Sequence, residues 1–442
     1  MSAAASRPAH RDHLWSVDEH LEDVLATVRP LEPIELQLLD AQGCVLVDDV
    51  TVPVSLPPFD NSSMDGYAVR VADVAGASEE FPAVLTVVGD VAAGAADLLQ
   101  VGPGQAARIM TGAPLPPGAE AVVPVEWTDG GLGGGPVSGM PARSLAPEGA
   151  TGQVRVHRPA EARAHVRAQG SDVKAGDLAL EAGTVIGAPQ IALLAAIGRG
   201  TVRVRPRPRV VVLSTGSELV QPDEDLAAGQ IYDSNSFALT AAARDAGAIA
   251  YRVGAVADDA DTLRSAIEDQ LLRADLVVTT GGVSVGAYDV VKEALTSVGD
   301  EDEDEAGGGV EFRKLAMQPG KPQGFGVIGR DHTPLLALPG NPVSSYVSFE
   351  LFVRPAIRTL MGLTDVHRPR ARAVLEADKA LTSPAGRRQF LRGKYADGTV
   401  TTVGGAESHL IAALAHADAL IVVPEDDTSV EPGAEVEVIL LG

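Results

Sequence analysis

Cysteine is almost absent from this 442-residue chain, since Cys44 is its single example. One thiol excludes an internal disulfide and any cysteine-rich metal site. The nine histidines show no metal-ligand spacing, so a zinc site is not predicted. No stretch of 18 consecutive apolar residues could span a membrane, and the N-terminus lacks the apolar core of a secretory signal. We therefore expect a cytoplasmic protein.

Basic residues are also scarce, with 35 Lys and Arg against 60 Asp and Glu and a formal net charge of −25. Such a chain is a poor match for nucleic acid or an anionic membrane, both of which favour a basic surface. If the ligand is an anion, its site must be a local exception built from a few cations, backbone N–H groups or a bound metal.

The pattern of apolar residues divides the chain into α/β and β regions. Strand-like and helix-like segments alternate within 209–362, which predicts a largely parallel sheet covered on both faces. Short apolar runs separated by Gly/Pro turns predict a β region over 53–177 and another over 363–442. Ser16 and Glu19 have capping-box spacing before an N-terminal helix. The acidic run at 300–305 indicates a solvated loop.

Polar and glycine-rich loops follow the strands predicted within 209–362. In a parallel sheet these loops gather at the carboxyl edge, where ligands bind. This convergence indicates a site that contains Ser214, Thr215, Gly216, Glu218, Asp258, Gly281, Gly282, Ser284, Asp289, Lys321, Pro339, Gly340, Asn341 and Pro342.

Each residue type in this set suits a phosphorylated ligand. Glycines let the backbone approach a phosphate, and Asn341-Pro342 is typical of a helix start that can hold an anion. Three carboxylates, Glu218, Asp258 and Asp289, would bind Mg²⁺ or serve acid–base chemistry. Asp258 could instead cap the helix that begins near residue 260.

One lysine stands out because it lies between two prolines in Pro319-Gly320-Lys321-Pro322. The prolines restrict the backbone, so a rigid loop presents one ammonium group to a phosphate or another oxyanion. Arg313 and Lys314 are candidates to add to this charge.

Two further polar loops lie in the first β region, at 57–68 and 108–114. Neither composition suits a strand or a helix, and ordered polar loops are often functional.

Several of these segments, in this order along the chain, resemble the molybdopterin molybdenumtransferases, which include the MoeA proteins and the E domain of gephyrin. The segments are PPFDNSSMDGYAV, RIMTGAPLP, STGSEL, GQIYDSN, TTGGVSVGAYD, PGKP and LPGNPVSS. The resemblance implies a homodimer that binds adenylylated molybdopterin and molybdate and, with Mg²⁺, inserts molybdenum and releases AMP. It also suggests a molybdopterin adenylyltransferase or recipient molybdoenzymes as protein partners.

The resemblance implies four domains around a MogA-like α/β domain. They are a discontinuous linking domain (13–53 and 173–206), a mostly-β domain that contributes to the partner's active site (54–172), the α/β domain (207–362) and a C-terminal β domain (363–442). Matching motifs also place functional residues at Asp60, Thr111, Asp172, Arg392 and Ser408.

Gln318 departs from the family, because many members carry a second basic residue directly before PGKP. Two other functions remain open at this point: a molybdopterin adenylyltransferase, and a scaffold that binds pterin or a partner protein.

Overall fold

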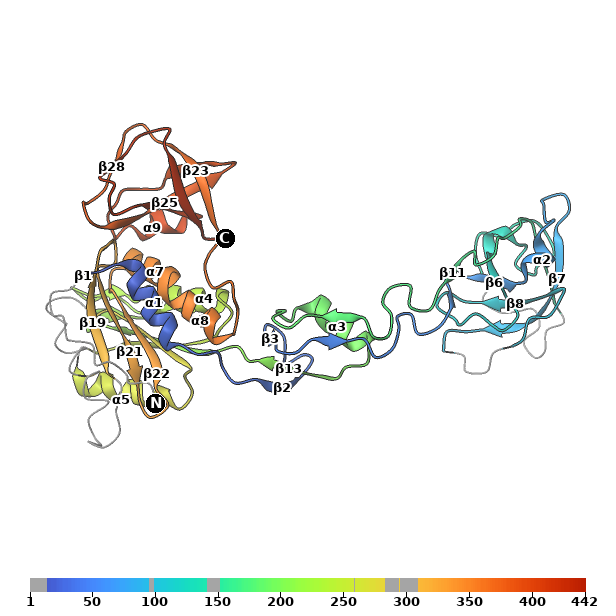
Figure 1. Ribbon diagram of the computed structural model, residues 1–442, viewed down its shortest axis with the longest axis horizontal. Coiled ribbons are helices and arrows are strands. Elements are labelled where there is room, and N and C mark those ends of the chain that lie inside the picture. The colour runs from blue at the N-terminus through green and yellow to red at the C-terminus, as the bar shows by residue number, and fades with distance from the viewer. Residues whose placement is uncertain (1–13, 95–98, 141–151, 258, 283–293, 295–308) are drawn as a thin grey trace. The chain divides into compact units, whose positions relative to one another are not determined.

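The computed structural model describes residues 14–94, 99–140, 152–257, 259–282, 294 and 309–442. The candidate residues Asp258, Ser284 and Asp289, and the acidic run at 300–305, lie outside these ranges. The chain divides into two compact units (Figure 1). Unit 1 comprises 1–36, 41–47 and 203–442, and unit 2 comprises 37–40 and 48–202. None of the described helices is long and apolar enough to cross a bilayer.

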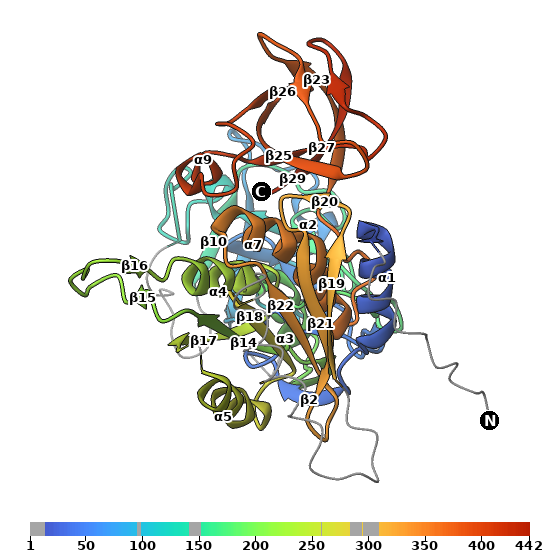
Figure 2. The same cartoon turned by 90° about the vertical axis from the view of Figure 1, so that its left-hand side faces the viewer.

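Unit 1 is built on a seven-stranded mixed sheet, most of whose strands are labelled in Figure 2. Its order is β1 (Leu14–Trp15), β19 (Val310–Leu315), β21 (Pro322–Ile328), β22 (Thr333–Leu338), β18 (Leu276–Thr280), β14 (Arg209–Thr215) and β17 (Ile249–Val256). The predicted parallel core is confirmed for β17, β14, β18 and β22. The expectation of a largely parallel sheet is wrong for β21, which pairs antiparallel with both β19 and β22.

Helices cover both faces of this sheet, as the alternation along β14 requires. Val210 and Val212 pack in one core with α4 (Asn235–Asp245), α7 (Pro342–Ser348) and α8 (Arg354–Leu360). Val211 and Leu213 pack in the other with α5 (Ala260–Leu271). A helix follows the start predicted at Asn341-Pro342, with a π-helical turn at Phe349–Val353 between α7 and α8.

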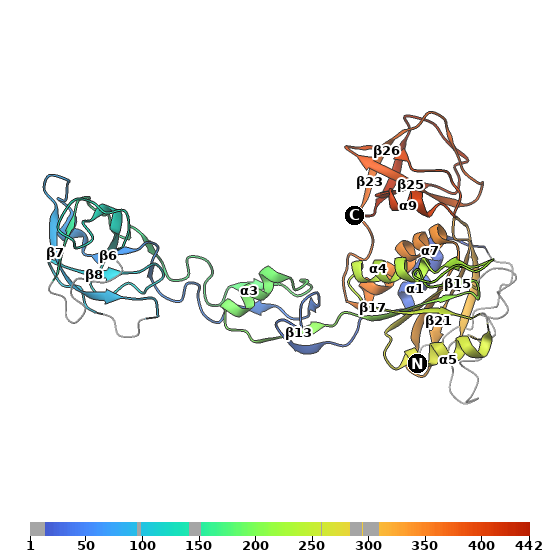
Figure 3. The same ribbon diagram turned by 180° about the vertical axis from the view of Figure 1, so that it is seen from behind.

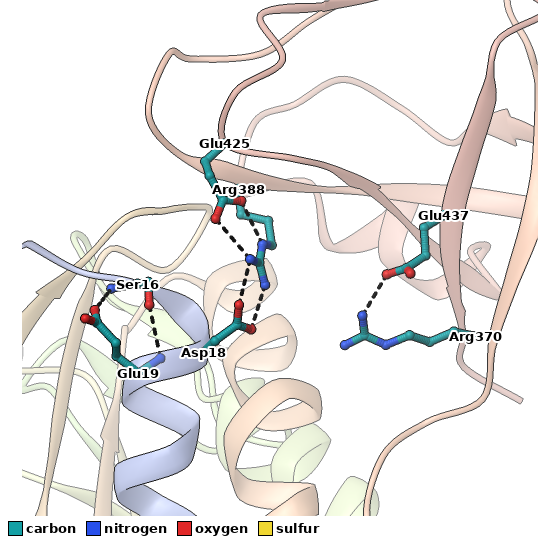
Figure 4. A network of polar contacts seen from close by, with 7 residues as sticks. All are labelled: Ser16, Asp18, Glu19, Arg370, Arg388, Glu425 and Glu437. Atoms are coloured by element: carbon teal, nitrogen blue, oxygen red, sulfur yellow. Dashed lines mark hydrogen bonds and ion pairs between the residues drawn. The ribbon is translucent and has the colours of Figure 1, made fainter.

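Helix α1 (Val17–Thr27) begins with the predicted capping box, in which Ser16 and Glu19 exchange hydrogen bonds (Figure 4). The same helix contacts the C-terminal β region. Arg388 lies between two carboxylates, at 2.8 Å from both oxygens of Asp18 and 3.0 Å from both oxygens of Glu425. These ion pairs raise the pKa of Arg388 and join α1 to the C-terminal domain.

That C-terminal domain is a six-stranded sheet closed by an extra pairing between β25 and β27, which fits a small barrel. Its order is β20 (Met317–Gln318), β25 (Arg388–Ala396), β26 (Thr399–Thr402), β23 (Arg370–Glu376), β29 (Glu435–Leu440) and β27 (Ala419–Val423). Strand β20 belongs by sequence to the α/β region, yet it pairs in parallel with β25.

Unit 2 holds the predicted first β region, whose strands are seen from behind in Figure 3. Its largest sheet has the order β10 (Gln153–Val156), β7 (Ala83–Val91), β8 (Gln105–Ile109), β6 (Gly66–Val69) and β9 (Ala121–Pro124). The same unit contains α3 (Ala188–Ala196).

His20, on α1, predicts a pH dependence of stability. Its ring is fully buried against Phe352 and near Arg313, and burial followed by repulsion from Arg313 lowers its pKa from 6.5 to about 3. Between pH 6.5 and pH 3, His20 binds a proton in the unfolded chain but not in the folded chain. The free energy of unfolding therefore falls as the pH drops from 6.5 towards 3. At pH 5 this should cost about 2 kcal/mol relative to pH 7.5.

Urea unfolding at the two pH values measures this effect. His20→Gln keeps an acceptor for Arg313 and does not titrate, so its loss of stability between pH 7.5 and pH 5 should be smaller by that amount. An equal loss in both proteins would contradict the assignment.

Candidate functional site

The described loops at the carboxyl ends of β14, β18 and β22 enclose one cavity of about 750 Å³, here called the edge cavity. Ten of the predicted residues line it: Ser214, Thr215, Glu218, Gly281, Gly282, Lys321, Pro339, Gly340, Asn341 and Pro342. The predicted gathering of these loops at one edge is therefore confirmed for their described residues. Gly216 lies in the same loop as Ser214 and Thr215, although it is not among the lining residues.

Side-chain hydrogen bonds hold the loops of the edge cavity together. The Asn235 amide donates to Thr280 Oγ1 at 3.1 Å and to the Gly340 carbonyl at 2.7 Å. Thr280 Oγ1 in turn donates to the Pro339 carbonyl at 3.0 Å. Because Thr280 ends β18 and Pro339 follows β22, these contacts fix the distance between two neighbouring loops.

A buried carboxylate supports the same wall. Asp233, 1% exposed, accepts hydrogen bonds from Ser214 Oγ at 2.7 Å and from the Ser236 amide and hydroxyl. Sequence reasoning assigned no role to Asp233 or Asn235, although both lie in the GQIYDSN stretch that resembles the family. The resemblance of that stretch to the family is the sequence signal that could have identified both residues.

Two lysines bring positive charge to the edge cavity, the predicted Lys321 and Lys314. They meet because β19 and β21 are antiparallel, with Lys314 opposite Pro322 in the register. The expectation that Arg313 adds to this charge is wrong. Its side chain is buried away from the cavity, where it pairs with Asp23 at 2.7 Å and stacks on Trp15.

Glu218 is the predicted carboxylate that the structure places at the edge cavity. The described residues contain no group of three His, Cys, Asp or Glu side chains able to hold a metal. The helix near residue 260, for which Asp258 was the alternative cap, is capped by Asp259 instead. Asp259 is the N-cap of α5 and accepts from the Thr262 amide at 2.9 Å.

Asn341, which lines the edge cavity, carries an unpartnered acceptor. Asn341 is the predicted N-cap of α7, but its side chain makes no capping hydrogen bond and its Oδ1 atom is buried without a partner. A buried carbonyl oxygen without a donor is unfavourable, so a ligand N–H in the cavity would satisfy it.

Asn235 and Asn341 form a matched pair for mutagenesis. Asn235→Ala removes two hydrogen bonds and should lower the free energy of unfolding by about 1 to 2 kcal/mol. Asn341→Ala removes an oxygen that has no partner in the protein, so it should leave stability within about 0.5 kcal/mol and weaken ligand binding instead. Urea unfolding and substrate titration of both variants measure this contrast, and an equal loss of stability would contradict it.

The C-terminal domain reaches the start of α7 through its 403–410 loop. The Ser408 carbonyl accepts from the Val343 amide at 3.1 Å, which places Ser408 beside the edge cavity. The next helix, α9 (Ile411–Ala415), begins after Leu410, so Ser408 does not cap it. Arg392 is 2% exposed, and its guanidinium donates to the Gly405 carbonyl, so it holds this loop in place.

The predicted residues of unit 2 lie on adjoining loops. The Ser62 amide donates to the Ala113 carbonyl at 3.0 Å, which joins the two predicted polar segments. The expectation that these segments hold no strand is wrong, because they include β5 (Asn61–Ser62), the start of β6 and the end of β8. Thr111 donates its amide and hydroxyl to Asp65 at 2.7 and 2.9 Å. Asp172 donates its amide to the Leu56 carbonyl, on a segment that runs beside the one leading to Asp60.

Asp60 is paired with a basic residue that sequence reasoning missed. Arg163 Nη1 donates to Asp60 Oδ2 at 2.5 Å, and the Gln169 amide donates to Oδ1 at 2.8 Å. These hydrogen bonds, that from Arg163 first, hold the pKa of the Asp60 carboxyl below its ordinary value. Nothing in the sequence singled out Arg163, which is 103 residues away along the chain.

Three family models match successive parts of the chain. They are the MoeA N-terminal region (domain I and II) at residues 15–198, a probable molybdopterin binding domain at 211–359, and the MoeA C-terminal region (domain IV) at 374–441.

Individual relatives agree with this match. The chain is 46% identical to molybdopterin molybdenumtransferase 2 of Mycobacterium tuberculosis over 427 residues, covering 96% of this chain and 98% of the relative. It is 40% identical to molybdopterin molybdenumtransferase 1 of the same organism over 450 residues, covering 96% and 99%. A solved structure, the molybdopterin biosynthesis MoeA protein from Pyrococcus horikosii, matches with a TM-score of 0.73 and 32% identity, covering 97% of this chain and 100% of that one.

Proposed function

The chain belongs to the family of molybdopterin molybdenumtransferases, and from this premise we propose that its edge cavity is where molybdenum is transferred to the pterin. The observation that carries the proposal is the convergence of three loops and two lysines on one cavity of about 750 Å³. That volume suits a small-molecule ligand. The general function, a transferase in molybdenum cofactor biosynthesis, follows from the family itself.

The residues of the edge cavity suit an anionic ligand with a polar ring. The ammonium groups of Lys314 and Lys321 would bind phosphate or molybdate oxygens, and Asn341 Oδ1 would accept an N–H of the pterin. Asp233 and Asn235 would keep the loops fixed while the ligand binds.

For the chemical step we propose adenylylated molybdopterin as substrate and AMP as a product. Breaking a phosphoric anhydride depends mainly on positioning and on neutralising charge at the phosphate, which the two lysines would supply. No nucleophilic side chain is needed for this step.

Mg²⁺ fits the donors that face the cavity. The Glu218 carboxylate is such an oxygen donor, and Mg²⁺ often binds through one or two carboxylates together with water and substrate phosphates. When bound, the ion would neutralise phosphate charge. Asp258 and Asp289 are the further carboxylates that the family resemblance assigns.

The decisive experiment combines the purified chain with adenylylated molybdopterin and molybdate, in the presence of either Mg²⁺ or a chelator. Cofactor formation is followed by activation of an apo-molybdoenzyme, and AMP is followed by chromatography. We expect equal amounts of both products, and neither with the chelator. Cofactor formed without AMP would refute the proposed chemistry, and turnover with the chelator would refute the metal.

We also propose a homodimer whose site takes Asp60 from the β domain of one subunit and Lys321 from the α/β domain of the other. Asp60→Asn and Lys321→Ala homodimers should then both have low activity. After dissociation, mixing in equal amounts and reassembly, about half of the dimers are mixed, and each mixed dimer has one intact site. Activity near a quarter of wild type is expected, and no recovery despite subunit exchange would refute sharing.

A further inference from the structure

Asp60 is one of three residues of unit 2 to which the family resemblance gives a functional position, yet its carboxylate is already engaged. Arg163 Nη1 occupies Oδ2 at 2.5 Å and the Gln169 amide occupies Oδ1 at 2.8 Å. A second contact joins the same loops, because the Gln169 side-chain amide donates to the Pro58 carbonyl at 2.8 Å. A carboxylate held on both oxygens is well placed to orient its partner.

That partner has an unusual backbone. Arg163 has a φ of 66°, in the left-handed region that disfavours residues with a Cβ, and His165, two residues on, has a φ of 55°. Glycine would adopt this conformation without strain. The gain from the side chain is small, since an exposed ion pair stabilises a fold little and Arg163 and Asp60 are 50% and 38% exposed. Stability therefore gives no reason for an arginine at this position.

The surrounding backbone nevertheless fixes this segment. The Arg163 amide donates to the Glu120 carbonyl at 2.8 Å, the Ala164 carbonyl accepts from Val122 at 2.9 Å, and the His165 carbonyl accepts from Ser63 at 2.9 Å. Strain that is held in place by neighbouring contacts is characteristic of functional sites.

The guanidinium is thus fixed at its base by the backbone and at its tip by Asp60. It has five N–H donors and gives one to Asp60, and half of the side chain is exposed, so donors remain for a ligand. A planar fork of donors is the geometry that binds two phosphate oxygens at once.

We propose that Arg163, oriented by Asp60, is the group with which the β domain binds a phosphate of the substrate. Asp60 is then a positioning residue, and Arg163 is the residue that contacts the anion. The inference rests on the proposed function, because it is the adenylylated substrate that brings a phosphate to this protein. It also accounts for a cation fixed on an exposed loop of a chain whose net charge is −25.

The test uses the full chain with Arg163→Gly, Arg163→Lys, Asp60→Asn and the double variant Asp60→Asn with Arg163→Gly. Arg158→Ala is the control, since it removes an exposed arginine of the same unit. The KM for adenylylated molybdopterin should rise about 10-fold or more in Arg163→Gly and less in Arg163→Lys, as expected for the loss of a charge-assisted hydrogen bond. The double variant should be no worse than Arg163→Gly, because Asp60 acts through Arg163.

Stability separates this role from a structural one. Arg163→Gly relieves the backbone, so it should melt at a higher temperature than wild type even as its KM rises. A more stable Arg163→Gly with an unchanged KM would overturn the proposal, and so would a rise of the same size in Arg158→Ala.

Binding of ADP, measured by calorimetry as a diphosphate probe, keeps the inference separate from the proposed function. ADP should bind about 10-fold more weakly to Arg163→Gly and to Asp60→Asn than to wild type, whether or not molybdenum is transferred. Failure of wild type to bind ADP, or equal affinity in wild type and Arg163→Gly, would overturn the role of Arg163. Loss of molybdenum transfer with the ADP contrast intact would count against the proposed function alone.

Discussion

Replacing both Lys314 and Lys321 with alanine is expected to lower kcat/KM for cofactor formation by at least about 100-fold. Each charge-assisted hydrogen bond is worth about 1.5 to 3 kcal/mol, and a loss of 1.4 kcal/mol is a factor of ten. Both lysines line the edge cavity, Lys314 within β19 and Lys321 directly before β21. Each single variant should show a smaller loss. Stability should change little, because Lys314 is exposed and Lys321 only half-buried.

The matched control is Lys379→Ala with Lys394→Ala, which removes the same charge from exposed positions of the C-terminal domain. Steady-state kinetics at two salt concentrations compare the two double variants. The cavity variant should lose both activity and salt dependence, and the control should keep both. Similar losses in the two would show that net charge matters and that the cavity lysines have no special role.

Glu350→Ala is expected to lower the free energy of unfolding by about 3 kcal/mol, because it removes one of the two carboxylates that Arg368 contacts and leaves two largely buried arginines with a single acceptor. The Glu350 side chain is 1% exposed and accepts from Arg368 at 2.8 and 3.2 Å. Arg368 and Arg354 are 12% and 9% exposed and would share only Asp245, at 2.8 and 2.9 Å. Urea unfolding measures the loss.

An exposed ion pair in the C-terminal domain provides the comparison. Arg370 and Glu437 lie 2.7 Å apart with side chains 47% and 33% exposed (Figure 4), so Glu437→Ala should cost no more than about 1 kcal/mol. If the two glutamate variants lose equal stability, burial is not what gives Glu350 its importance.

The sequence predicts the α/β domain well where its pattern is local. The alternation of strands and helices within 209–362 and the capping box at Ser16 need only short-range information, and both are present. The antiparallel pairing of β21 was missed although a signal existed. Residues 329–332 are too few for the crossover that parallel strands require. Strand β13 (Thr201–Arg205) was not predicted, because its partner β3 (Val45–Leu46) is distant along the chain.

The site was less predictable, because its contacts join distant residues. Loop convergence follows from topology, so most of the edge cavity could be named in advance. Arg313 was wrongly grouped with Lys314 because the strand Val310–Leu315 was not recognised, and neighbouring residues of a strand point to opposite faces. The contact between Asp60 and Arg163 spans 103 residues and depends on a left-handed backbone at Arg163, which residue type alone does not reveal.

The pairing of β20 with β25 limits how this protein can be recombined with its relatives. Met317 and Gln318 pair with Arg388 and Gln389, so the segment leading into the Lys321 loop is a strand of the C-terminal barrel. A chimaera joined between α8 and β23 would pair the host's strand with a foreign barrel. Exchange of the C-terminal domain as an evolutionary or engineered module therefore has to carry the 316–319 segment with it, although the two pieces are far apart in the gene.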